Sequence, residues 1–231
     1  MKAAWRWSRW ALAVAVLFAV AWQGWYFGWV VWWKYFNPST TSFMSLRLDE
    51  LREKDPRAEL MKQWVPYERI SIHLKRAVIA AEDAKFSEHE GFDWEGIQKA
   101  LEKNQKKGRF VAGGSTISQQ LAKNLFLSGD RTPWRKAQEA LITLMLEAVL
   151  DKRRILEIYL NVVEWGSGVF GAEAAARHYY GIVAARLSAE QAARLAVLLP
   201  NPRKFGRLPN SPYLAARAQI ILGRMNAAEV P

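Results

Sequence analysis

An uncharged apolar segment near the N-terminus constrains the fold of this chain more than any other feature. Residues 10–33 read WALAVAVLFAVAWQGWYFGWVVWW and contain no Asp, Glu, Lys or Arg. As an α-helix this segment would be roughly 36 Å long, against about 30 Å for the hydrocarbon core of a bilayer. It lacks a polar face, which disfavours a buried helix of a soluble protein. The segment therefore predicts a single transmembrane helix.

The residues around the segment favour an uncleaved anchor with a cytoplasmic N-terminus. Eight of the twelve Trp residues lie within residues 1–34, crowded at both ends of the apolar segment, as in the aromatic belts of spanning helices. Lys2, Arg6 and Arg9 precede the segment, and positive residues favour the cytoplasmic side. The alternative is a signal peptide cleaved after Ala21. Twelve further apolar positions follow that site, however, and a signal core has only about 7–15 residues.

The rest of the chain is expected to form one mainly α-helical domain. The predicted parts are a cytoplasmic tail (1–9), the transmembrane helix (10–33), a connector (34–63) with a charged run broken at Pro56, and the domain (64–231). Apolar residues recur at helical spacing through the domain and no long alternating strands occur, which predicts about eight helices after the anchor.

Helix boundaries are predicted from spacing and end signals. Thr132 before Pro133 is typical of an N-cap followed by a first helical residue, and Ser188 with Gln191 is a capping-box pattern. The predicted helices are an apolar one from residue 74 that ends at Glu82-Asp83, then 115–126, 132–151, 155–165, one ending at 180 after the glycine-rich turns of 166–171, and one from 188 that ends before Pro200. Residues 103–114 are basic and contain glycine, which predicts a mobile loop, with short stretches such as 109–112 pairing locally.

Charge and composition narrow the classes of function. The chain has no Cys, which excludes a disulfide scaffold, a thiol nucleophile and a Cys-ligated metal, and its three His are scattered. The net charge is +11, of which residues 1–34 carry +4, so the rest carries +7. That excess indicates an anionic partner: nucleic acid, an acidic membrane face or a phosphorylated substrate. No spacing typical of a nucleic-acid-binding motif is present, and the anchor places the domain away from the chromosome.

Three segments between residues 82 and 139 carry candidate chemistry. Glu82 and Asp83 end an apolar helix, where burial and the negative helix end both raise the pKa of a carboxylate, as a general base requires. Residues 113–126, GGSTISQQLAKNLF, place two glycines before a helix start with free N–H groups suited to an anion. Residues 131–139 set three cations before Glu139. Taken singly, these are also the patterns of ordinary helix ends and surface ion pairs.

Together the segments closely resemble one family. The stretches EDAKFSEHEGFD (82–93), GGSTISQQLAKNLFLS (113–128), RKAQE (135–139) and KRRILEIYLN (152–161) match, in order and spacing, the motifs of the peptidoglycan glycosyltransferases. Residues 164–181 and 199–210 are similar to the monofunctional biosynthetic peptidoglycan transglycosylases, and the resemblance covers about residues 64–217. It implies a lysozyme-like helical fold. No Lys-Thr-Gly or Ser-x-Asn set occurs, so the transpeptidase activity of larger relatives is expected to be absent.

The resemblance also implies the reaction and its residues. The family polymerises lipid II into linear β-1,4 glycan strands with inversion at the donor carbon. By position, Glu82 matches the catalytic base and Glu139 the second catalytic glutamate. The residues matching the diphosphate and neighbouring site are Ser115, Gln119, Gln120, Lys123, Arg131, Arg135 and Lys136, and those supporting the motif are Asp83, Phe86, His89 and Gly91. Tyr159 and Asn161 are expected to be structural. The role of Glu139 stays open between orienting cations, binding a divalent ion and assisting departure of the leaving group.

The expected partners follow from this reaction. They are lipid II, the nascent glycan chain, the membrane and other cell-wall synthesis or division proteins, with no nucleic acid. The family implies a divalent cation, Mg²⁺ or Mn²⁺, and no organic cofactor, but the sequence shows no metal cage, so the metal ligands stay unassigned. The domain is expected on the outer, periplasmic face of the cytoplasmic (inner) membrane. The rival interpretations are a lysozyme-like glycan-cleaving enzyme, which has no diphosphate to neutralise, and a non-enzymatic membrane-anchored binder of anionic polymers.

Overall fold

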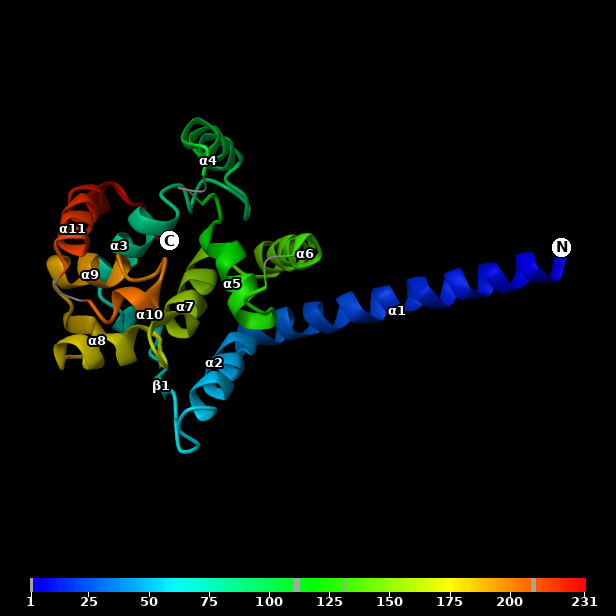
Figure 1. The fold of residues 1–231 in the computed structure, drawn as a ribbon, viewed down its shortest axis with the longest axis horizontal. Helices are drawn as coiled ribbons and strands as arrows, with labels where there is room; N and C mark the ends of the chain where they lie inside the picture. Colours follow the sequence, from blue (N-terminus) through cyan, green and yellow to red (C-terminus); the bar gives the residue numbers. More distant parts are fainter. Residues whose placement is uncertain (1, 110–112, 131, 209–210) are drawn as a thin grey trace.

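The computed structural model describes residues 2–109, 113–130, 132–208 and 211–231, and it shows a helical domain from which one long helix projects (Figure 1). In chain order the elements are α1 (Lys2–Tyr35), α2 (Ser42–Arg52), β1 (Met61–Lys62), η1 (Tyr67–Arg69), α3 (Ile72–Glu82), α4 (Trp94–Lys107), α5 (Ile117–Phe126), α6 (Pro133–Val149), α7 (Lys152–Val162), β2 (Glu164–Gly166), β3 (Val169–Phe170), α8 (Ala172–Tyr180), η2 (Ala184–Arg186), α9 (Ala189–Ala196), α10 (Pro202–Phe205), α11 (Pro212–Arg224) and η3 (Met225–Ala227).

Helix α1 contains the predicted spanning segment. By length and composition alone, its residues Trp7–Tyr35 could cross a membrane. The N-terminal part of α1 stands clear of the domain, whereas its C-terminal part lies beside α6 (Figure 1). Val30 and Trp33 are buried there, because they pack against the domain rather than facing solvent. The predicted fold class, a mainly α domain behind one long apolar helix, is confirmed.

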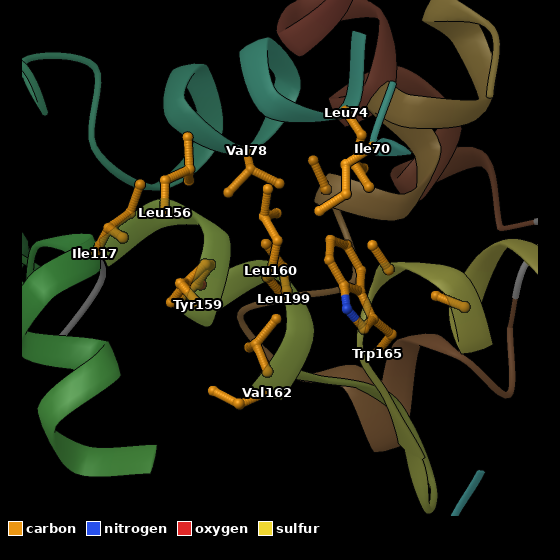
Figure 2. Packing of buried hydrophobic residues seen from close by; sticks show 14 of the residues in the cluster. Ile70, Leu74, Val78, Ile117, Leu156, Tyr159, Leu160, Val162, Trp165 and Leu199 are labelled. Carbon is orange, nitrogen blue, oxygen red and sulfur yellow. The ribbon is translucent and has the colours of Figure 1, made fainter. Parts of the chain in front are cut away.

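Helix α7 lies at the centre of the core. Asp151 caps its N-terminus by accepting the main-chain N–H of Arg154, and the side chains of Leu156, Tyr159 and Leu160 are fully buried. Figure 2 shows these side chains with those of α3 and α5 gathered around them. Because residues 155–162 of α7 are buried, apart from the half-buried Glu157, this helix fixes the positions of the two helices that carry Glu82 and the 117–126 segment.

A small three-stranded sheet accompanies the helices. β3 lies between β1, to which it is parallel, and β2, to which it is antiparallel. The strands are only two or three residues long, which is why no alternating pattern predicts them. Both β1 and α2 lie within residues 34–63, the predicted connector, and α2 packs against α5.

Two predicted helix ends are wrong around α7. The preceding helix, α6, stops at Val149 instead of Asp151, because the side chain of Asp151 caps the next helix. Helix α7 stops at Val162 instead of Trp165, because residues 164–166 pair with β3 as strand β2. Apolar residues continue without interruption through this region, so periodicity alone does not locate the change from helix to strand.

The loop predicted over residues 103–114 is also wrong in its first half. Lys103–Lys107 form the last turns of α4, which begins after the Asp93 cap and ends at Gly108 with a left-handed backbone, φ +60°. Lysine and glutamine are good helix formers, so only the glycine interrupts the helix. Residues 110–112 lie outside the described residues, and so does most of the predicted local pairing of 109–112.

The predicted caps at Thr132 and Ser188 are confirmed. Thr132 accepts the N–H of Arg135, with Pro133 in the first turn, and Ser188 forms a capping box with Gln191. In the part of the chain that is described, ten α-helices follow α1 rather than about eight. Helices α4 and α11 lie outside the predicted ranges. So do the short helix α10 and the connector helix α2, since four residues or a charged run give little periodic signal.

Candidate active site

One cleft of about 550 Å³ collects the predicted site residues from α3, α5 and α6 and from the segment before α5. Those that line it are Glu82, Ser115, Gln119, Gln120, Lys123, Arg135, Lys136 and Glu139. Arg131 lies outside the described residues. Residues separated by up to 57 positions in the chain therefore share one concave surface, which the sequence pattern alone does not establish.

Glu82, the last residue of α3, is largely enclosed by protein. Its Oε2 accepts a hydrogen bond from Nε2 of Gln120 at 2.7 Å. Burial raises the pKa of the Glu82 carboxyl above its ordinary value, while Gln120 and Lys123 act in the opposite direction. A carboxyl whose pKa is raised in a cleft is a competent proton acceptor near neutral pH. The sequence-based expectation of a raised pKa is therefore supported, with burial as the largest cause.

The N-terminus of α5 is fixed beside Glu82 by buried hydrogen bonds. Thr116 and Gln119 form a capping box, in which the Gln119 side-chain oxygen accepts the main-chain N–H of Thr116. The neighbouring Asp83 accepts the N–H of Ile117 through Oδ2 at 3.0 Å. Gln119 thus lines the cleft but uses its side-chain oxygen to hold the helix start.

The predicted support residues lie behind the cleft. Asp83 is buried and its Oδ1 lies 2.9 Å from Nε2 of His89, while Phe86 is fully buried in the core. Gly91 has φ +88°, and its carbonyl accepts the hydroxyl hydrogen bond of Thr116 at 2.7 Å. A Cβ at Gly91 would lie 2.8 Å from Thr143, so a side chain is excluded there. These contacts connect the turn after α3 to the start of α5.

The cations of the cleft surround a buried carboxylate. Glu139 is 3% exposed, and its two oxygens accept hydrogen bonds from Nη1 of Arg135, at 2.6 Å, and from Nζ of Lys136. Lys136 also donates to the hydroxyl of Ser115 at 3.2 Å. Burial lowers the pKa of Lys123, which lies across from this group on α5. Arg135 and Lys136, held by one carboxylate, and Lys123 across from them form a cluster of three cations that suits a polyanionic ligand such as a diphosphate.

A second cleft, of about 510 Å³, meets the first at Glu82. Glu82, Ser115, Gln120 and Pro200 line both clefts. The second cleft is lined in addition by Lys103 of α4, Phe205 of α10, and Tyr213 and Arg217 of α11. The candidate base therefore lies where two clefts of similar size join. A reaction between two large substrates requires such an arrangement, with one cleft for each substrate.

The described residues do not fit a divalent cation held by protein ligands. Among them, no group of three or more His, Asp or Glu side chains is placed to bind a metal ion. Glu139 already accepts hydrogen bonds from Arg135 and Lys136, whose charges would oppose a bound cation.

Several cleft residues were missed by sequence reasoning. Phe43 and Arg47 enter the cleft from α2, and Arg47 donates to the buried carboxylate of Glu164 at 3.1 Å. Asn201 and Arg203 line the same end. Glu164 lies within a motif already matched to the family, which could have indicated it, whereas α2 lies in the charged connector and gave no signal.

Comparisons with known proteins show the family of the chain. Residues 49–226 match the transglycosylase family. Over 98% of both chains, the sequence is 63% identical to a biosynthetic peptidoglycan transglycosylase of Nitrosospira multiformis. It is 65% and 63% identical, over the full length of both chains, to proteins of the same name from Azoarcus sp. and Dechloromonas aromatica. The chain therefore belongs to the transglycosylase family.

Proposed function

We propose that this protein polymerises lipid II into linear β-1,4 glycan strands by inverting glycosyl transfer. As a transglycosylase whose full-length relatives are named for peptidoglycan biosynthesis, the chain is a glycosyltransferase of peptidoglycan synthesis. The observation that carries the finer proposal is that Glu82 and the Lys123, Arg135 and Lys136 cations line one cleft. A base and a diphosphate site on opposite surfaces could not act on one reaction centre.

Glu82 is proposed as the general base on the acceptor. The acceptor's C4 hydroxyl attacks C1 of the donor sugar, and its proton passes to the Glu82 carboxylate as the new C–O bond forms. The second cleft, with Arg217 and Lys103, would hold the acceptor and its own diphosphate. Attack from this side places the nucleophile and the leaving group on opposite faces of C1, which inverts its configuration.

The cation cluster is proposed to hold the donor diphosphate. The bond from C1 to the diphosphate oxygen breaks, and the bonding electrons leave with the lipid diphosphate. A diphosphate is a good leaving group that needs charge neutralisation more than a proton, which Lys123, Arg135 and Lys136 supply. The presence of these cations also argues against a lysozyme-like glycan-cleaving enzyme, because cleavage of a neutral glycan produces no diphosphate charge to neutralise.

Of the roles open to Glu139, orientation of cations is best supported. Each of its oxygens accepts a hydrogen bond from a different cation, Arg135 or Lys136. Because α6 carries all three residues within five positions, the carboxylate holds the two long side chains in one geometry before substrate binds. We therefore propose Glu139 as the residue that preorganises the diphosphate site.

The proposed location follows from α1. We propose that α1 anchors the protein in the cytoplasmic (inner) membrane, with the N-terminus in the cytoplasm and the domain on the periplasmic face. Lipid II exposes its diphosphate at the headgroup level, so a tethered domain meets its substrate in two dimensions. The proposed partners are lipid II, the nascent glycan and other cell-wall synthesis or division proteins. No transpeptidase activity is proposed, since the 231 residues contain none of its motifs.

A polymerisation assay tests the proposal. Purified full-length protein is incubated separately with lipid II and with finished, uncrosslinked glycan, and the products are separated by size. We expect polymer from lipid II and no change in the glycan. Shortening of the glycan without polymer from lipid II would establish the degradative rival, and binding without either reaction would establish the non-enzymatic one.

The same assay tests the divalent cation expected from the family. Since the described acidic residues form no cage, the requirement for Mg²⁺ or Mn²⁺ remains a prediction. Polymer formation is compared after treatment with a chelator and after adding back each ion. Loss on chelation with recovery on either addition would establish the requirement.

A further inference from the structure

A chain of hydrogen bonds leads from the buried core to Glu82 in the cleft. Tyr159 of α7 is 0% exposed, and its hydroxyl donates to Oε1 of Gln120 at 3.0 Å. Nε2 of the same Gln120 donates to Oε2 of Glu82 at 2.7 Å. Figure 2 places Tyr159 on α7 within the core, away from solvent. Helices α7, α5 and α3 thus contribute one side chain each to this chain of hydrogen bonds, in which every donor points toward Glu82.

We propose that Tyr159 is a positioning residue that holds the Gln120 side-chain amide with its NH₂ group toward Glu82. A glutamine amide can present either its oxygen or its NH₂ group to a neighbour, and a half-turn exchanges them. A buried tyrosine hydroxyl needs an acceptor, and Oε1 of Gln120 is the acceptor it contacts. That bond fixes the amide oxygen on the Tyr159 side and leaves the NH₂ group on the Glu82 side.

The orientation of this amide decides which form of Glu82 is favoured. This step rests on the proposed role of Glu82 as base. An N–H donor stabilises the ionised carboxylate, whereas an amide oxygen in the same place would stabilise the protonated acid. The other charged groups around Glu82 are Lys123 and Arg217, which favour ionisation, Asp83, which opposes it, and Lys103 across the second cleft. Tyr159→Phe leaves all of these in place and removes one hydroxyl.

The pH dependence of the Tyr159→Phe variant tests the proposal in the full-length protein. Without the hydroxyl, the Gln120 amide can turn, so a higher pH is needed to ionise Glu82. We expect the acid limb of kcat/KM for lipid II to move up by about one pH unit, the effect of one hydrogen bond to a charged group, with activity recovered at alkaline pH. An equal loss at every pH, as from a packing defect, would overturn the proposal, and so would an unmoved limb unless the Glu82 carboxyl itself titrates at higher pH.

Tyr67→Phe is the matched control. Tyr67 is also buried, and its hydroxyl donates to the main-chain oxygen of Pro231 at 2.6 Å, outside both clefts. This variant removes the same group from the core without touching Gln120. We expect its acid limb to coincide with that of the unmodified protein. A matching shift in both variants would show that any lost tyrosine hydroxyl has this effect, and would refute a specific role for Tyr159.

A direct titration separates this proposal from the proposed function. Carbon-13 NMR of glutamate-labelled protein follows the Glu82 carboxyl, whose resonance is identified by its absence in Glu82→Gln. We expect the Tyr159→Phe change to move the titration of this resonance to higher pH. If the resonance moves while the kcat/KM profile does not, Tyr159 orients the amide and Glu82 is not the base. If the resonance does not move, the role of Tyr159 is wrong whatever the activity shows.

A double-mutant comparison shows whether Tyr159 acts through Gln120. In a Gln120→Met background there is no amide to orient, so adding Tyr159→Phe should leave the Glu82 titration unchanged. The double variant also leaves no unpaired amide in the core, so loss of folding is avoided. A further shift in the double variant would mean that the hydroxyl acts on Glu82 by another route, and would overturn the proposal.

Discussion

At the scale of single residues, the burial of Glu82 has two effects: it raises the carboxyl pKa, as the proposed base requires, and it lowers the stability of the fold when the carboxyl is ionised. Burial raises the pKa of its carboxyl, so the folded protein binds this proton more tightly than the unfolded chain does. The stabilising contribution of the protonated form is complete below the ordinary glutamate value of about 4.3 and is lost as pH rises through the raised folded value. Above that range the fold carries an enclosed negative charge.

Replacing Glu82 by glutamine should therefore separate activity from stability. Glu82→Gln keeps the shape and removes the base, so we expect polymerisation to fall by about 10²–10⁴-fold. The same variant should have a higher Tm than the unmodified protein, by a margin that grows as pH rises above the ordinary glutamate range. Thermal unfolding at several pH values, beside the lipid II assay, measures both. Full activity would reject the base assignment, and a lower Tm at neutral pH would reject the buried-charge argument.

Lys123 should contribute charge more than packing. It lines the cleft opposite Arg135 and Lys136, and Lys123→Met keeps most of its length while removing the ammonium. We expect kcat/KM for lipid II to fall by about 10²–10³-fold, as when one preorganised donor to a developing charge is lost. Lys54→Met, at an exposed site after α2, is the control and should leave kinetics unchanged. Unchanged kinetics for Lys123→Met would argue against diphosphate contact there.

At the scale of elements, Asp83 determines how α5 meets the end of α3. Its two oxygens contact the Ile117 N–H and the His89 ring. Asp83→Ala leaves that buried N–H unpaired, which costs about 1–3 kcal/mol, or about 2–4 °C of Tm for each kcal/mol in a chain of this size. Asp83→Asn retains an acceptor and should lose less. Circular dichroism during heating measures both, and equal Tm values for Asp83→Ala and the unmodified protein would refute the argument.

Some features of the helices and of the site could be predicted from the sequence, and others could not. Caps were predictable, because Thr132 and Ser188 each act on a main-chain N–H three residues away. The candidate site residues were indicated by the family motifs, but only folding brings Glu82 and Glu139 to one cleft. The ends of α6 and α7 were not predictable, because strand β2 forms by pairing with β3 and the local sequence remains apolar. Arg47 lines the cleft because α2 packs against α5, and no local sequence pattern indicates this packing.

At the scale of the whole molecule, the anchor and the domain form one packed structure. Tyr26 and Trp33 of α1 lie against Phe126 of α5, with ring centroids 5.1 and 4.9 Å apart. These residues belong to the apolar segment that is proposed to cross the membrane. If α1 crosses the membrane as proposed, we expect the domain side that meets α1 to lie close to the hydrocarbon boundary. Exposed apolar side chains of α6, Leu141 and Leu144, suit such an environment.

A pair of side-chain amides joins these two parts, in addition to the hydrogen bond that Nε of Arg154 donates to the main-chain oxygen of Trp33 at 2.9 Å. Nε2 of Gln23 donates to Oε1 of Gln138, and Nε2 of Gln138 donates to Oε1 of Gln23, each at 3.0 Å. Gln23 is the only side-chain amide in residues 10–33, and Gln138 directly precedes Glu139. Unpaired amides are costly where water is scarce, so each glutamine needs the other. The pair therefore sets the register of α1 along α6, and with it the height of the cation cluster above the membrane.

The coupling between these glutamines is measurable. Gln138→Leu leaves Gln23 unpaired, and we expect a loss of about 0.6–2 kcal/mol, the range for interhelical hydrogen bonds in membranes. Gln23→Leu with Gln138→Leu removes both amides and should recover much of that loss, a non-additivity that a double-mutant cycle of Tm values in nanodiscs reports. Gln98→Leu, which breaks only an exposed bond to Glu102 on α4, is the control. Additive effects of the two leucines would mean that the two amides do not pair between α1 and α6, because two side chains that bond each other cannot be lost independently.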